Sequence, residues 1–90
     1  MSGCTRPIRS TNRRGLHARA SAKFVNMASA MTAQVEVEKD GNRVCGTSIM
    51  GLMMLGAAMG DTIVIHCEGE DCGVAIAQLA ELVESRFGEV

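Results

Sequence analysis

The sequence predicts an α+β fold, an open-faced sandwich in which a four-stranded antiparallel sheet carries three helices on one face. Residues 18–31 carry apolar side chains at intervals of three or four, as one face of a helix does. Residues 33–37 alternate apolar and polar side chains, which is typical of a half-buried strand. Residues 62–67 form a mostly β-branched run, typical of a central strand. The chain has 90 residues and is 47% apolar, so we expect one domain over residues 1–90.

The N-terminal part of the chain predicts one strand and one helix. Residues 4–9 form a weak strand pattern, and Pro7 confines that strand to an edge or an end because proline cannot donate to a ladder. A polar loop over residues 12–15 leads into the helix over residues 18–31. The face of this helix that we expect to be buried consists of Ala18, Ala22, Val25, Ala28 and Met31.

The middle of the chain predicts a hairpin. The strand over residues 33–37 leads to Asp40-Gly41, a pair typical of a two-residue turn with positive φ angles. A short return strand is therefore expected over residues 43–46, and residues 62–67 supply the fourth strand. The order of the strands within the sheet does not follow from the sequence.

Two further helices complete the predicted order β-α-β-β-α-β-α. Thr47 or Ser48 can cap a short helix that runs to Leu55, and Asp71 can cap the last helix. The apolar face of the last helix consists of Ile76, Leu79, Ala80, Val83 and Phe87.

Composition and charge narrow the classes of partner. The chain has two phenylalanines and no tryptophan or tyrosine, so it has little aromatic surface on which nucleic-acid bases could stack, and nucleic-acid binding is the weakest hypothesis. Residues 1–23 hold six basic residues and no acidic one, whereas the rest of the chain holds three basic residues and ten acidic ones. The basic part suits a phosphate group or an acidic partner.

No apolar stretch is long enough for a transmembrane helix, because the longest, residues 49–59, is broken by Gly51 and Gly56. The polar N-terminus shows no signal peptide, so we expect a cytoplasmic protein without membrane insertion. The four cysteines lack C-x-x-C spacing, so we expect free thiols in a reducing compartment. A small metal-binding domain built from these cysteines is a competing hypothesis.

The sequence Gly15-Leu16-His17-Ala18-Arg19 marks the strongest candidate site. His17 falls at the predicted first turn of a helix, where unpaired backbone N–H groups and the helix dipole favour an anion. Neutral imidazole is a nucleophile near pH 7, and its phosphoramidate is labile enough to give the group away. We therefore expect a phosphoryl group on His17, bound by the Arg19 guanidinium and by the backbone N–H groups of Ala18 and Arg19.

Plainer interpretations stay open for both histidines. His17 would have the same neighbours in the sequence if it were a loop residue without a function. His66 is expected to be structural, at the end of a strand. No carboxylate or cysteine cluster completes a set of metal ligands around His17, so we expect no metal there.

The predicted second helix is unusual because it is apolar nearly all round. Leu52 and Leu55 can face the core, which leaves Ile49, Met50 and Met53 on a different face. An exposed methionine-rich patch suits docking to several partners, although a fully buried short helix would show the same pattern.

Together, G-L-H-A-R-A-S-A-K-F-V and the later S-I-M-G-L-M-M-L-G resemble the motifs of the HPr family, the histidine-containing phosphocarriers of the bacterial phosphotransferase system. The resemblance covers nearly the whole chain, including the G-D-T-I-V-I strand, and it implies a four-stranded antiparallel sheet with three helices. It implies that phosphorylated Enzyme I phosphorylates His17 on Nδ1, with Arg19 as the arginine of the active-site motif. His17 would then pass the phosphoryl group to an EIIA domain.

The resemblance also implies regulation. Ser48 matches a serine that the ATP-dependent HPr kinase/phosphorylase modifies in many bacteria, and Ile49, Met50 and Met53 match the family's docking patch for partners. A phosphate on Ser48 would be bound by free N–H groups of the helix N-terminus and would add about −1.5 to −2 charges beside that patch, weakening Enzyme I binding. Ser48 as a simple N-cap is the alternative.

One position departs from the family motif, which usually reads H-A-R-P, because Ala20 replaces the proline. Alanine keeps the helix, and the change is similar to the nitrogen-type (NPr-like) regulatory chains of some proteobacteria. A rival function is a non-catalytic docking protein controlled by Ser48 phosphorylation, with no role in phosphoryl relay. In either case we expect a monomer with no cofactor, more a substrate of its partners than an enzyme.

Overall fold

Four strands and three α-helices follow the expected order in the computed structural model, which describes residues 3–88. The strands are β1 (Gly3–Arg9), β2 (Gln34–Lys39), β3 (Asn42–Cys45) and β4 (Thr62–Glu68). The helices are α1 (Ala18–Ser29), α2 (Ile49–Met54) and α3 (Cys72–Glu84), and a short 3-10 turn, η1 (Arg86–Gly88), follows α3. The predicted α+β class is confirmed, while residues 1, 2, 89 and 90 of the predicted domain lie outside the described residues.

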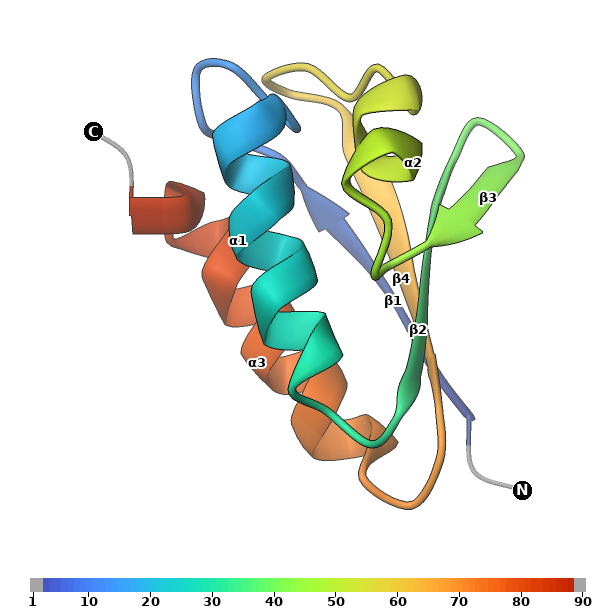
Figure 1. Ribbon diagram of the computed structural model, residues 1–90. Coiled ribbons are helices and arrows are strands. Elements are labelled where there is room, and N and C mark those ends of the chain that lie inside the picture. The colour runs from blue at the N-terminus through green and yellow to red at the C-terminus, as the bar shows by residue number, and fades with distance from the viewer. Residues whose placement is uncertain (1–2, 89–90) are drawn as a thin grey trace.

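All strand pairs are antiparallel, and the order across the sheet is β1-β4-β2-β3 (Figure 1). β4 is an interior strand, as its β-branched sequence predicts, with Ile65 opposite Arg6 of β1 and Val37 of β2. β1 is an edge strand, as Pro7 requires. Asp40 and Gly41 have φ angles of 52° and 85° and join β2 to β3 in the expected tight turn.

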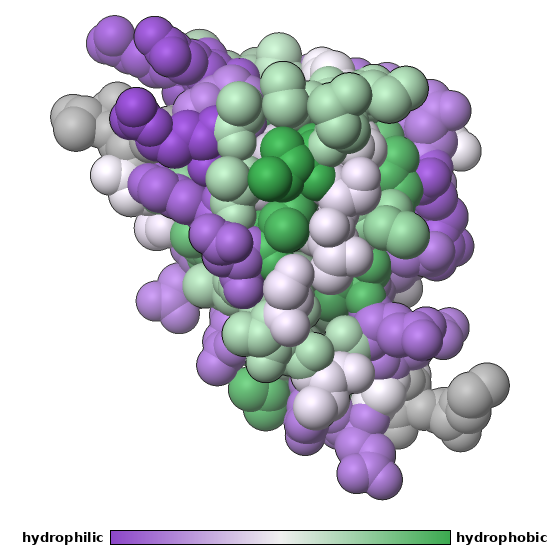
Figure 2. Space-filling view, in the orientation of Figure 1, coloured by the Kyte–Doolittle hydropathy of each residue, from purple (hydrophilic) through white to green (hydrophobic). Residues whose placement is uncertain are grey.

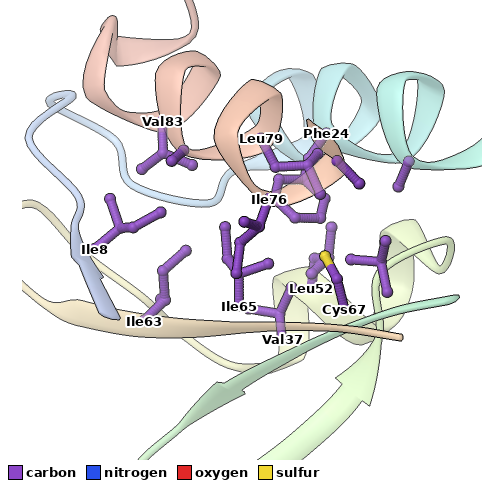
Figure 3. Packing of buried hydrophobic residues seen from close by; sticks show 14 of the residues in the cluster. Ile8, Phe24, Val37, Leu52, Ile63, Ile65, Cys67, Ile76, Leu79 and Val83 are labelled. Carbon is purple, nitrogen blue, oxygen red and sulfur yellow. The ribbon is translucent and has the colours of Figure 1, made fainter. Parts of the chain in front are cut away.

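The hydrophobic core lies between the sheet and the helices. Ile63 and Ile65 of β4 point toward the helical layer, and Phe24 of α1 and Leu79 of α3 point toward the sheet (Figure 3). These side chains are fully buried, and each contributes about 1.5–3 kcal/mol through burial. This layer fixes the first turn of α1 and the position of α2, where the candidate site lies.

The buried face of α1 differs from the predicted face. Ala18 is exposed, Val25 and Met31 are only partly buried, and the helix ends at Ser29. The residues that turn inward are Ala20, Ser21, Phe24 and Ala28. The prediction is confirmed for Ala28 and wrong for Ala18, because it left out Phe24, whose large side chain decides which face is buried.

Two expectations about α3 also need correction. Asp71 is the N-cap residue of α3, as expected, but its side chain makes no capping bond, and Oδ2 instead accepts a hydrogen bond from Thr32 Oγ1 at 2.9 Å. Phe87 is buried as expected, but it lies in η1, beyond the helix. Arg86 and Phe87 have positive φ angles of 60° and 55°, and this left-handed turn brings the Phe87 ring onto the core.

Candidate functional site

His17 is the N-cap residue of α1 and so lies one position before the first turn in which it was expected. Its backbone is extended, with φ −73° and ψ 178°, and its carbonyl accepts the Ser21 N–H at 2.9 Å. The ring atom Nδ1 accepts a hydrogen bond from the Arg19 N–H at 3.2 Å. This bond uses the Nδ1 lone pair, so the neutral ring carries its proton on Nε2. His17 is partly exposed, so a partner can reach it.

The surroundings of Nδ1 favour a bound anion. The lone pair and the Arg19 N–H are directed toward each other, so an electrophile attached to Nδ1 would bring its oxygens close to this N–H group. The first turn of α1 holds no acidic residue that would offset the positive end of the helix dipole. Arg13, Arg14 and Arg19 are exposed around this turn. The arrangement suits a phosphoryl group on the ring.

The turn before His17 is fixed by close contact with the segment that follows α2. Gly15 has a φ angle of 59°, and a Cβ atom there would overlap the carbonyl of Ala57. The next residue, Leu16, is buried and donates its N–H to Ala57 O at 3.0 Å. Only glycine allows both the positive φ and this approach. The position of the His17 ring therefore depends on Gly15.

A buried polar network supports the same turn. Ser10 and Asn12 are each 1% exposed, and Ser10 Oγ donates to Asn12 Oδ1 at 2.9 Å. Asn12 Nδ2 donates to Gly15 O at 2.8 Å. Ser10 is itself bonded through its backbone to Asp61 O at 2.8 Å and to the Gly60 N–H at 2.6 Å. The network joins the end of β1, the turn before His17 and the start of β4.

Ser48 is the N-cap of α2, and of the two expected caps, Thr47 and Ser48, it is the one that the structure uses. Its Oγ accepts the Gly51 N–H at 3.0 Å, and the residue is half-buried. This bond satisfies one of the unpaired N–H groups at the start of the helix.

The exposed face of α2 forms a hydrophobic surface beside α1. Leu52 and Leu55 are buried, whereas Ile49, Met50 and Met53 are exposed, as predicted. Figure 2 shows hydrophobic residues on the face that carries α1 and α2, with hydrophilic residues at its margins. Because α1 and α2 contact each other, this surface is continuous with the helical layer that begins at His17.

The other candidate ligands have structural contacts. His66 Nε2 lies 2.8 Å from Glu38 Oε1, and its Nδ1 lies 3.2 Å from Thr5 Oγ1, so the ring bridges three strands as expected of a structural side chain. The four cysteines are free thiols. Among residues 3–88, no group of three or more histidine, cysteine or acidic side chains is arranged to hold a metal ion.

Comparison with known proteins finds matches along almost the whole chain. Residues 4–85 match the family model described as the PTS HPr component phosphorylation site.

The chain belongs to the HPr family. It is 49% identical over 78 residues to the phosphocarrier protein HPr of Neisseria meningitidis serogroup A, covering 87% of this chain and 88% of that protein. It is 33% identical over 89 residues to the phosphocarrier protein NPr of Shewanella violacea, covering 99% and 98%. The crystal structure of HPr-C-His from Thermoanaerobacter tengcongensis is similar with a TM-score of 0.89 at 44% identity, covering 100% and 99%.

The expected resemblance is thus confirmed, and the chain is an HPr-family phosphocarrier of the phosphotransferase system. Both HPr and NPr proteins are among its relatives, so the nitrogen-type branch stays a prediction. Ala20, which departs from the family motif, is fully buried in α1, where its small side chain fits the core. No helix within residues 3–88 is long and apolar enough to cross a membrane.

Sequence reasoning missed part of this HPr-family site. Asn12 was assigned only to a polar loop and Ser10 was not singled out, although serine and asparagine side chains often bond to nearby groups in turns. Met54 and Met59 were not singled out, yet they are 80% and 60% exposed, and Met54 extends the hydrophobic surface of α2. The exposure of Met54 follows from how α2 packs on the core, which the local pattern does not determine.

Proposed function

We propose that His17 accepts a phosphoryl group from phosphorylated Enzyme I on Nδ1 and passes it to EIIA domains, with the chain acting as a monomer without a bound cofactor. The observation that supports this most directly is the hydrogen bond from the Arg19 N–H to Nδ1 at the N-cap of α1. It leaves the nucleophilic lone pair on Nδ1 and aims a donor at the place where charged oxygens arrive.

In this mechanism the Nδ1 lone pair attacks phosphorus in line while the bond to the donor breaks. The Arg19 N–H then moves from Nδ1 to a phosphoryl oxygen, and the N–H of Ala18 at the same helix start binds the group as well. The Arg19 guanidinium lies in an exposed position and stabilises the added negative charge. Transfer to EIIA reverses these steps.

The test is incubation of the purified chain with phosphoenolpyruvate and Enzyme I, followed by mapping of the phosphate. We expect one acid-labile, base-stable phosphate on His17, because phosphohistidine has this stability. Transfer of that phosphate to an added EIIA domain completes the relay. A phosphate found on His66 or on a serine, or none at all, contradicts the proposal and leaves the rival function, a docking protein without a role in the relay.

We further propose that Ile49, Met50 and Met53 dock Enzyme I and EIIA beside His17. A charged residue at Met50, which is 70% exposed on α2, would have to be desolvated in the complex. We expect Met50→Glu to lower kcat/KM for phosphoryl transfer from Enzyme I about 10- to 100-fold. Spontaneous hydrolysis of the phosphohistidine should stay unchanged, because the substitution leaves the ring in place.

The matched control for this surface is Val74→Glu. Val74 is a similarly exposed apolar residue, 62% accessible, but it lies on α3. Val74→Glu should leave kcat/KM within about twofold of the value of the unaltered chain, since Val74 lies outside the proposed surface. Equal losses in both variants would show that the effect of Met50→Glu is not local.

We also propose that Ser48 is the regulatory site of an HPr kinase/phosphorylase. Its position at the N-cap of α2, next to Ile49 and Met50, supports this, because the modified side chain would carry about −1.5 to −2 charges at the edge of the docking surface. With kinase and ATP we expect an acid-stable phosphate on Ser48 and at least about tenfold slower phosphorylation by Enzyme I. Thr47→Ala should keep this response, whereas Ser48→Ala should lose it. If chains phosphorylated on Ser48 accept the phosphoryl group from Enzyme I at an unaltered rate, the proposed regulation is refuted.

A further inference from the structure

The exposed methionines of the chain are gathered in one short segment. Among residues 3–88, most of the large hydrophobic side chains that are exposed are methionines, and these all lie within residues 50–59. They are Met50, Met53, Met54 and Met59, of which Met54 is the most exposed and Met53 the least. The two methionines of the α1 region differ, because Met27 and Met31 are partly buried and pack against the core. Exposed thioethers are therefore a feature of this segment and not of the described surface as a whole.

Three of these methionines share one side of α2, here called the methionine face. Met50, Met53 and Met54 are at positions i, i+3 and i+4, which are neighbours on the surface of a helix. Leu52 and Leu55 are buried on the opposite side, so the packing of α2 on the core does not use the methionines. Figure 1 shows α2 beside the start of α1, and the two helices contact each other. The methionine face thus lies within the proposed docking surface.

A docking surface made of methionine has a reactivity that one made of leucine or isoleucine lacks. A hydroperoxide converts the apolar thioether into a sulfoxide, which is polar and accepts hydrogen bonds from water. Docking would remove that water, and burying a polar group without a new hydrogen bond is unfavourable. The reaction needs only access to each sulfur, which the exposure of the methionine face provides. Oxidation would therefore change how this surface binds a partner.

We propose that hydroperoxides reversibly oxidise the methionine face of α2 and that its sulfoxides weaken docking of Enzyme I and EIIA. This inference rests on the proposed function, whose docking surface it makes sensitive to oxidants. A sulfur lone pair attacks one peroxide oxygen, the S–O bond forms, the O–O bond breaks, and water or an alcohol leaves. The sulfur loses two electrons and the peroxide gains them. A methionine sulfoxide reductase reverses the change, because two thiols of its reductant become a disulfide and the oxygen leaves as water.

The fold and the phosphoryl acceptor should be unaffected by this oxidation. The methionine face does not contribute to the buried core, and the Arg19 N–H that bonds to His17 Nδ1 belongs to α1. We therefore expect the melting temperature to stay within about 3 °C, and hydrolysis of the phosphohistidine to keep its rate. The change should appear as a fall of about 5- to 20-fold in kcat/KM for phosphoryl acceptance from Enzyme I.

The experiment treats the full-length chain with hydrogen peroxide and then with dithiothreitol, which returns cysteine disulfides and sulfenic acids to thiols but leaves sulfoxides in place. Mass spectrometry then locates the added oxygen atoms. We expect oxidation first at Met50 and Met54, then at Met53, and last at the partly buried Met27 and Met31. The fall in kcat/KM should follow oxidation of the methionine face, and methionine sulfoxide reductases for both sulfoxide epimers should restore the original value.

Variants assign the effect to α2 when each is compared with its own untreated form. The triple variant Met50→Leu/Met53→Leu/Met54→Leu should lose the response to peroxide, because leucine has a similar volume and is not oxidised. Met59→Leu is the matched control, since Met59 is an exposed methionine beyond the end of α2, and it should keep the full response. Cys45→Ser should also keep it, although Cys45 is an exposed thiol on β3, which contacts α2.

Four results would overturn the inference: an undiminished response in the triple leucine variant, loss of the response in Met59→Leu, a melting temperature that falls together with kcat/KM, or sulfoxides on α2 that leave kcat/KM unchanged. The untreated chain distinguishes this failure from failure of the proposed function. If the untreated chain accepts no phosphate from Enzyme I, the proposed function is wrong and the effect of oxidation is wrong with it. If it accepts phosphate and the oxidised chain reacts equally fast, only the oxidation inference is wrong.

Discussion

Replacing His17 by alanine or by asparagine should abolish phosphoryl acceptance. Incorporation of phosphate from phosphoenolpyruvate through Enzyme I should fall by more than about 100-fold, because the covalent acceptor itself is removed. Neither Arg19 nor the N–H groups at the start of α1 can replace a nucleophile, since all of them are donors. The measurement is the amount of acid-labile phosphate per chain after saturating treatment with Enzyme I.

The asparagine variant separates chemistry from folding. His17 caps α1 by accepting the Arg19 N–H, so alanine should cost on the order of 1 kcal/mol of stability. Asparagine is among the preferred N-cap residues, so His17→Asn should keep the helix start while it removes the ring. His66→Ala should accept phosphate normally, because His66 contacts only Thr5 and Glu38 among the bonds described. A folded His17→Asn chain that still carries acid-labile phosphate would disprove the assignment.

Local signals in the sequence were sufficient for most elements of this fold. Pro7 limited β1 to an edge or an end, Asp40-Gly41 predicted the hairpin, and Ser48 was one of two proposed caps for α2. In each of these cases the deciding interaction lies within a few residues along the chain, so the pattern contains the information.

Interactions between distant segments explain what the sequence did not predict. The strand order depends on which strands pair across long connections, and the inward face of α1 depends on how Phe24 fits between α3 and the sheet. Asp71 was expected to cap α3, but Thr32, which is far away in the sequence, donates to its carboxylate instead. Competition from such distant partners cannot be read from spacing alone.

The same division holds for the site. His17, Arg19 and the exposed face of α2 could be predicted because the motif and the helical period are local. The support beneath them could not, because Asn12 is bonded to the turn before His17 and to Ser10, and the backbone of Ser10 is bonded in turn to the distant Gly60 and Asp61. The histidine is thus predicted by its own neighbours in the sequence, and its exact place is fixed by the segment between α2 and β4.

Replacing Gly15 by alanine should be the most damaging single-methyl change near the site. A Cβ atom at this position would overlap the carbonyl of Ala57, and the backbone already has a φ angle of 59°. The turn must then move, which breaks the bond from the Leu16 N–H to Ala57 O and displaces His17. We expect a loss of about 3–5 kcal/mol in the free energy of unfolding in urea, and slower phosphoryl acceptance by the chains that remain folded.

Gly41→Ala is the matched control, because it isolates the cost of a positive φ angle. Gly41 has a φ angle of 85°, but a Cβ atom there would meet no atom within 4 Å. This substitution should cost only about 1 kcal/mol and leave phosphoryl acceptance unchanged, since Gly41 lies in the β2–β3 turn and not in the turn that precedes His17. Similar losses of stability in the two variants would mean that the positive φ angle alone explains the cost of replacing Gly15. A larger loss at Gly15, together with a slower reaction, would show that contact with Ala57 holds the phosphoryl acceptor in place.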